Sequence, residues 1–184
     1  MTGIASKSQL RMSFLRYALF TVPAVLLLGT LSGAISGAGN GNAWFASLHK
    51  PPQMPPGWVF GAAWSILYIL LGLSLAMVLH ANGAKDRKRA LRLFAVQLVL
   101  NFAWSPVFFA FHKVAPALSI IAAMIVVTVA MIFVIWRIRM VAALLLYPYL
   151  GWLIFAGVLN YQILTLNPNA DTVAPGGPST DIPL

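Results

Sequence analysis

Five apolar runs, each long enough to cross a bilayer as a helix, constrain the fold of this chain more than any other feature. A spanning helix needs about 20 predominantly apolar residues. Hydrophobic residues make up 60% of the sequence and charged residues only 8%, whereas roughly 25% of an average soluble domain is charged. The sequence therefore predicts an all-α membrane protein, a bundle of five transmembrane helices. The expected spans are residues 17–37, 58–79, 91–111, 114–136 and 141–164.

The five runs lie between a basic segment, residues 1–16, and a polar segment, residues 167–184. The basic segment and first run could be a secretory signal, but that run is longer than the usual apolar core of about 7–15 residues. We therefore expect an uncleaved first helix and a transmembrane domain over residues 17–166. The polar segment is rich in Pro, Gly, Thr and Asp, a composition that predicts disorder.

The Lys and Arg residues are divided unequally between the two ends of the expected bundle. Lys50 and Lys113 lie at one end, and all the others lie at the end that carries the N-terminus. Cytoplasmic loops are enriched in these residues, so we expect a cytoplasmic N-terminus and an outside C-terminus, in a bacterial-type cell membrane. This topology explains the net charge of +9 without a nucleic-acid partner. The cations at the N-terminal end are Lys7, Arg11, Arg16, Lys85, Arg87, Lys88, Arg89, Arg92, Arg137 and Arg139.

A Pro-rich loop directly precedes the second span. Pro51, Pro52, Pro55 and Pro56 lack backbone N–H donors and have a fixed φ, so the loop cannot be the interior of a helix. It is stiff and aromatic, and it continues into the apolar run that begins at Trp58. We expect this loop to cover the mouth of the bundle.

Polar and aromatic residues recur at helical spacing on three of the expected helices, so each set shares one helix face. An amide that faces lipid is costly, so Gln97 and Asn101 should face the interior of the bundle. The three sets are Trp64 and Tyr68; Gln97, Asn101, Trp104, Ser105 and Phe108; and Tyr149, Trp152, Ala156 and Asn160.

Helical rise places several of these side chains in the half of the membrane below the Pro-rich loop. At 1.5 Å per residue, Trp64 lies about 9 Å, Trp104 about 10 Å and Trp152 about 18 Å below that surface, with Asn101 at about 15 Å. They could line one cavity beneath the loop. They could equally be packing residues and interhelical hydrogen bonds, and spacing alone leaves both interpretations open.

Small residues recur on the first span. Gly29, Gly33 and Gly37 form a GxxxGxxxG pattern, which lets helices approach closely. The contact could lie within the bundle or between two protomers, and in the second case these glycines would form a homodimer contact.

The sequence offers little catalytic chemistry. It contains no Glu and no Cys, and its three acidic residues, Asp86, Asp171 and Asp181, lie in a basic loop or in the polar segment. We therefore expect no metal site and no required cofactor. An apolar, Trp-lined cavity with a few amides and phenols suits a large, flat, mostly apolar ligand.

Several motifs together resemble the tryptophan-rich sensory protein/translocator protein family (TspO, the peripheral benzodiazepine receptor family), over about residues 17–166. The resemblance implies a five-helix bundle, commonly a homodimer, that binds porphyrins and other haem-pathway tetrapyrroles and senses, regulates or transports them. The motifs are Trp44-Phe45, Lys50-Pro51, Pro55-Pro56, Trp58-Val59-Phe60, Trp64 to Tyr68, Gln97-Leu98, Asn101 to Ser105, Phe108-Phe109, Pro148-Tyr149, Trp152, Ala156 and Leu159-Asn160.

The resemblance also implies which residues bind the ligand, with Trp44 in the lid. Some members degrade porphyrin in light, and the Trp pair implicated there matches Trp64 and Trp152. Two departures are Gln53, where the family loop commonly has Trp, and the lack of a cation after Tyr161, which argues against binding cholesterol. With Tyr68 added for its spacing, the expected ligand-binding residues are Trp44, Trp64, Tyr68, Asn101, Trp104, Tyr149, Trp152 and Ala156.

Overall fold

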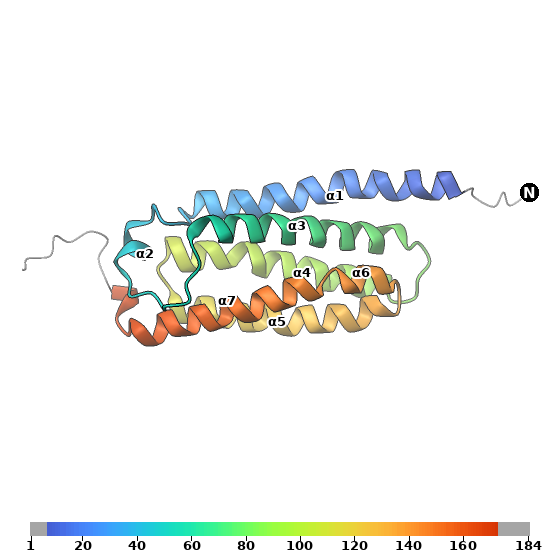
Figure 1. Ribbon diagram of the computed structural model, residues 1–184. Helices are drawn as coiled ribbons and strands as arrows, with labels where there is room; N and C mark the ends of the chain where they lie inside the picture. Colours follow the sequence, from blue (N-terminus) through green and yellow to red (C-terminus); the bar gives the residue numbers. More distant parts are fainter. Residues whose placement is uncertain (1–6, 173–184) are drawn as a thin grey trace, which may run out of the picture.

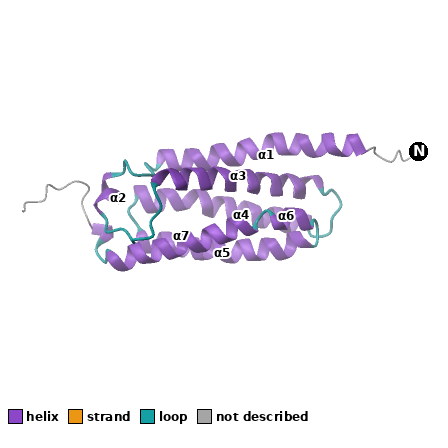
Figure 2. Ribbon diagram, in the orientation of Figure 1, coloured by secondary structure: helices purple, strands orange, loops and turns teal. Residues whose placement is uncertain are grey.

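The computed structural model describes residues 7–172 as a bundle of long helices that lie side by side (Figure 1). Five of the helical segments in this part of the chain are long and apolar enough to cross a membrane. No strand occurs within it, as Figure 2 shows, so the predicted fold class is confirmed. The long helices are α1 (Lys7–Ile35), α3 (Gly57–His80), α4 (Arg87–Ser105), α5 (Val114–Trp136) and α7 (Tyr147–Leu166).

Short helical elements extend or connect the long helices. The π-helical turn η1 directly continues α4, and α6 precedes α7, so that α6 and α7 together form the fifth candidate span. Helix α2 lies between α1 and the Pro-rich loop, where the Asn42 side chain caps it by accepting from the Phe45 N–H. The short elements are α2 (Ala43–Ser47), η1 (Pro106–Ala110), α6 (Met140–Leu144) and the 3-10 turn η2 (Ala170–Thr172).

The connections alternate between the two ends of the bundle. The α3–α4 and α5–α6 connections lie at the end where α1 begins, and α2, the Pro-rich loop and the end of α7 lie at the other (Figure 1). The basic loops therefore share one end, as the sequence predicts. Lys50 and Lys113 lie at the opposite end, where Lys113 forms a 3.4 Å ion pair with Asp171.

Helix α1 packs closely along α3. A Cβ added at Gly72 would lie 2.7 Å from the Cα of Val22, so the two backbones leave no room for a side chain there. The Thr21 hydroxyl donates across this contact to the Gly72 carbonyl at 2.8 Å. The absence of a side chain at Gly72 thus allows α1 and α3 to approach closely at this point.

A second contact of α1 provides a hydrogen-bond donor for a backbone carbonyl of α4. Pro106 has no N–H, so the Phe102 carbonyl one turn earlier lacks its usual helical donor. The Ser32 hydroxyl of α1 donates to that carbonyl at 2.6 Å. Inside a membrane, backbone groups freed by Pro must find partners within the protein, and Ser32 provides one.

The segment after α7 contacts the Pro-rich loop. The Asn167 side chain accepts from the His49 N–H at 2.8 Å and donates to the His49 carbonyl at 2.9 Å, which joins this segment to the Pro-rich loop. The expectation of disorder over residues 167–184 stays a prediction: residues 167–172 make these long-range contacts, and residues 173–184 lie outside the described residues. At the other end, α1 already begins at Lys7, within the expected basic segment.

The α1–α3 contact predicts different effects for two Gly→Ala substitutions in α3. Gly72→Ala should lower the free energy of unfolding by about 1–3 kcal/mol, because the added methyl group meets the backbone of α1. Thermal unfolding in detergent would measure it.

Gly61→Ala is the matched control, since a Cβ at Gly61 meets nothing within 4 Å. It should leave stability unchanged or raise it, because Ala has the higher helix propensity. Equal melting temperatures for the two variants would contradict the proposed packing.

Candidate ligand-binding cavity

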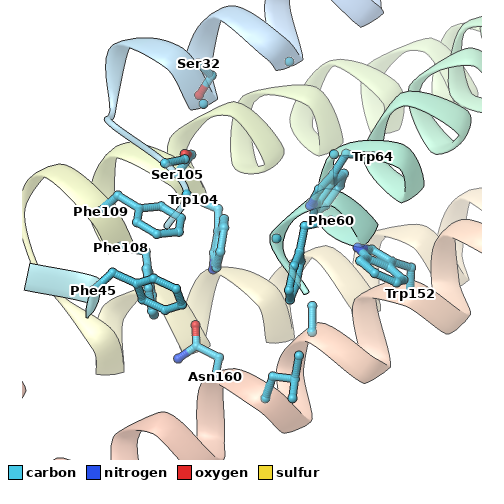
Figure 3. A pocket seen from close by; sticks show the side chains of 18 of the residues that line it. Ser32, Phe45, Phe60, Trp64, Trp104, Ser105, Phe108, Phe109, Trp152 and Asn160 are labelled. Carbon is cyan, nitrogen blue, oxygen red and sulfur yellow. The ribbon is translucent and has the colours of Figure 1, made fainter. Parts of the chain in front are cut away.

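A cavity of about 800 Å³ lies beneath the Pro-rich loop, and Figure 3 shows many of the side chains around it. Its lining comes from α1, α2, the Pro-rich loop, α3, α4 with η1, α5 and α7. Its volume falls within the range of about 300–1,000 Å³ that is typical of small-molecule sites. Six of the eight expected ligand-binding residues line it: Trp64, Tyr68, Asn101, Trp104, Trp152 and Ala156.

Helices α3 and α7 supply one aromatic wall. The Trp64 and Trp152 rings meet edge to face, with centroids 6.5 Å apart and planes at 84°. Phe60 lies one turn before Trp64 and packs against Trp152 at 5.8 Å. Edge-to-face contacts of this kind hold aromatic side chains in fixed orientations.

Helix α4, η1 and α2 supply a second aromatic wall, across the cavity from the first in Figure 3. Trp104 stacks on Phe108, with centroids 5.2 Å apart and planes at 19°. Phe45 of α2 packs on Phe108 at 6.0 Å and on Phe109 at 5.4 Å. The π turn adds a residue to the helical turn, which allows Trp104, Phe108 and Phe109 all to face the cavity.

A buried hydrogen-bond network lies at the base of the cavity. The Tyr68 hydroxyl donates to Asn101 Oδ1 at 3.0 Å, and Asn101 Nδ2 donates to the Tyr149 hydroxyl at 2.9 Å. Gln97 Nε2 donates to the same hydroxyl at 2.7 Å. The network joins α3, α4 and α7 and fixes the orientation of Asn101 and Tyr68 in the cavity wall.

Tyr149 and Trp44 are the two expected ligand-binding residues that do not line the cavity. Tyr149 is fully buried behind Asn101, so it positions the wall instead of forming it. Trp44 of α2 has a buried side chain, whose ring stacks on His112 with centroids 4.5 Å apart and whose Nε1 donates to the Ala170 carbonyl at 2.9 Å. Its neighbour Phe45 lines the cavity.

Several polar atoms around the cavity lack a hydrogen-bond partner within residues 7–172. The indole N–H groups of Trp104 and Trp152 are buried and unpaired, as is Asn160 Oδ1. Nearly all buried polar groups in proteins have a partner. A bound ligand with hydrogen-bond acceptors would supply one for each indole.

The cavity shows no chemistry of a metal centre. No group of three or more His, Cys, Asp or Glu residues comes together in the described part of the chain. Lys50 is the only charged residue among those that line the cavity there.

Sequence reasoning left several lining residues out of the expected set. Phe60 lies four residues before Trp64 and Phe108 four residues after Trp104, so the helical period already indicated both. Phe45 and Phe109 had no such signal, because Phe45 lies in the short helix α2 and Phe109 in the π turn η1, and the directions of both elements depend on tertiary contacts.

The glycines of α1 have a structural explanation within one chain. Gly29 is buried, and a Cβ there would overlap the Tyr68 ring. Gly33 lines the cavity, and Gly37 adopts the left-handed conformation, with φ of 63°, just after α1 ends. A homodimer contact through Gly29, Gly33 and Gly37 stays a prediction.

Comparison with known proteins extends over most of the chain. Residues 21–166 match the model of the TspO/MBR family. The chain is 38% identical to the tryptophan-rich protein TspO of Archaeoglobus fulgidus, over 80% of this chain and 94% of that protein. It is 34% identical to protein CrtK of Rhodobacter capsulatus, over 85% of this chain and 96% of that protein. It is 39% identical to the translocator protein of Bos taurus, over 74% and 82% respectively.

The network at the base of the cavity predicts the effect of removing one hydroxyl. Tyr149→Phe should lower the free energy of unfolding by about 1–3 kcal/mol, because two buried amide donors lose their acceptor. Thermal unfolding in detergent would measure this loss. Tyr147→Phe, which changes an exposed Tyr at the start of the same helix, should have no effect. A neutral Tyr149→Phe would show that the network does not hold the helices together.

Proposed function

Since this chain belongs to the TspO/MBR family of membrane proteins, we propose that it is a receptor or sensor that binds a tetrapyrrole in the cavity beneath the Pro-rich loop. The ligand would be a porphyrin or a haem-pathway intermediate, which the protein regulates or transports. The observation that carries this proposal is the pair of aromatic walls around a cavity of about 800 Å³, with unpaired indole donors in each wall.

The chemistry of the two walls matches a flat macrocycle. Stacking on aromatic rings and burial of apolar area favour a large planar ligand without requiring charge inside the membrane. The N–H groups of Trp104 and Trp152 would donate to acceptors on the ligand. Because Trp64, Trp104 and Trp152 come from three helices, the ligand would contact most of the bundle.

The distribution of charge supports a membrane orientation. The basic end, with the α3–α4 and α5–α6 connections, would face the cytoplasm, and the cavity mouth would face the opposite side. We place the protein in a bacterial-type cell membrane with its N-terminus inside. A homodimer is proposed with it, on the family resemblance.

A second candidate function is light-dependent degradation of bound porphyrin. The contact between Trp64 and Trp152, with ring centroids 6.5 Å apart, favours it, since both indoles line the cavity beside the ligand. In this case the two indoles would serve as electron or radical partners of the excited porphyrin.

The receptor proposal predicts which Trp residues matter for binding. Protoporphyrin IX should quench the intrinsic Trp fluorescence saturably, and Trp104→Phe or Trp152→Phe should each weaken its binding about 2- to 10-fold. Each change keeps an aromatic ring but removes one donor, and a hydrogen bond contributes about 0.5–1.5 kcal/mol.

Trp58→Phe is the matched control, because Trp58 is 75% exposed at the start of α3 and does not line the cavity. It should leave the affinity unchanged. Linear quenching, the same in all variants, would mean that porphyrin only partitions into the micelle and would refute the receptor proposal.

The degradation proposal predicts a separate outcome under illumination. The porphyrin Soret band should decline in light with wild-type protein, and Trp64→Phe and Trp152→Phe should each abolish the decline. Trp58→Phe should leave its rate unchanged. Equal rates in the wild type and both cavity variants would exclude a role for the pair, while saturable dark binding would still support a receptor.

A further inference from the structure

The cavity carries a single charge within the part of the chain that the structure describes. Lys50, in the loop after α2, is the only Lys, Arg, Asp or Glu among the lining residues. Its side chain is exposed, so the charge lies at the mouth, where water still reaches it. In the sequence Lys50 is a topology signal and part of a family motif, and its place in the lining gives it a further role.

The ammonium group lies at one end of the second aromatic wall. Lys50 Nζ is 4.9 Å from the centroid of the Phe45 ring, in cation–π geometry. Phe45 packs on Phe108, which in turn stacks on Trp104. A planar ligand that lies along this wall therefore has its outer edge next to the Lys50 cation.

Lys50 has no carboxylate partner among residues 7–172. Its Nζ donates only to the Ala46 carbonyl, at 3.3 Å. The other Lys at this end, Lys113, differs in this respect because it pairs with Asp171 at 3.4 Å. Asp171, the only acidic residue described at this end of the bundle, is paired with Lys113, so an anionic ligand next to Lys50 would meet an uncompensated cation and little repulsion from the described residues.

We propose that Lys50 binds a carboxylate of the ligand and makes the cavity selective for amphiphilic acids over neutral molecules of the same shape. The apolar body would lie along the Phe45, Phe108 and Trp104 wall, and the carboxylate would stay at the hydrated mouth. This inference rests on the proposed function, and it adds that the charge at the edge of the ligand determines specificity.

The test compares an acid with its neutral ester in the same binding assay. Protoporphyrin IX and its dimethyl ester share the macrocycle and differ in the two carboxylates. Lys50→Gln should weaken binding of the acid about two- to fivefold, as expected for a partly exposed ion pair, and leave binding of the ester unchanged. Added salt should weaken the acid complex of the wild type more than that of Lys50→Gln.

Two further variants test whether the effect depends on the charge of residue 50 and on its position at the cavity mouth. Lys50→Arg keeps the charge and should retain the preference for the acid. Lys113→Gln removes one charge from the same end of the bundle, outside the cavity lining, and should leave both affinities unchanged.

Three outcomes would overturn the inference. Equal weakening of acid and ester by Lys50→Gln would show that the side chain only packs the loop, and no change in either would show that it does not contact the ligand. In both cases saturable binding by the wild type would leave the proposed function intact. Failure of the wild type to bind either form saturably would refute the proposed function together with the inference.

Discussion

The hydroxyl group of Tyr149 is the hydrogen-bond acceptor on which the arrangement of the bundle around the cavity depends. It accepts from Gln97 and from Asn101, and Asn101 in turn accepts from Tyr68. These bonds join α3, α4 and α7 directly below a cavity that side chains of the same helices line. Inside the membrane no water can replace a lost partner, so the network favours one relative placement of the three helices.

The mouth of the cavity is held by a second set of contacts. Asn167 pairs with both backbone groups of His49, and Trp44 donates to the Ala170 carbonyl. The Pro-rich loop is thereby fastened to the end of α7. Hydrogen bonds thus hold the helices at the base of the cavity and the loop at its mouth. The cavity is therefore largely formed before a ligand enters, which lowers the entropic cost of binding.

Local sequence signals predicted the helices and most of the cavity. Apolar length defines a spanning helix without tertiary information, and helical spacing together with the family resemblance placed Trp64 and Trp152 in one cavity. Trp44 does not line the cavity, because its orientation depends on a contact with Ala170, 126 residues away in the sequence, which local sequence signals do not report. Tyr149 shares a helix face with Trp152, but it lies behind Asn101 and does not reach the cavity. Helical spacing predicts which face of a helix a residue is on, and it does not predict which other side chains cover that residue.

The central claim is that the cavity between the aromatic walls is the ligand site. Fluorine NMR of protein labelled with 5-fluorotryptophan tests it most directly, because the six Trp residues give six separate probes. Titration with protoporphyrin IX should shift the resonances of Trp64, Trp104 and Trp152 saturably, since the porphyrin ring current acts on nearby nuclei, and leave those of exposed Trp58 and Trp136 in place. Shifts confined to Trp58 and Trp136 would show that the porphyrin binds the outer surface and would contradict the claim.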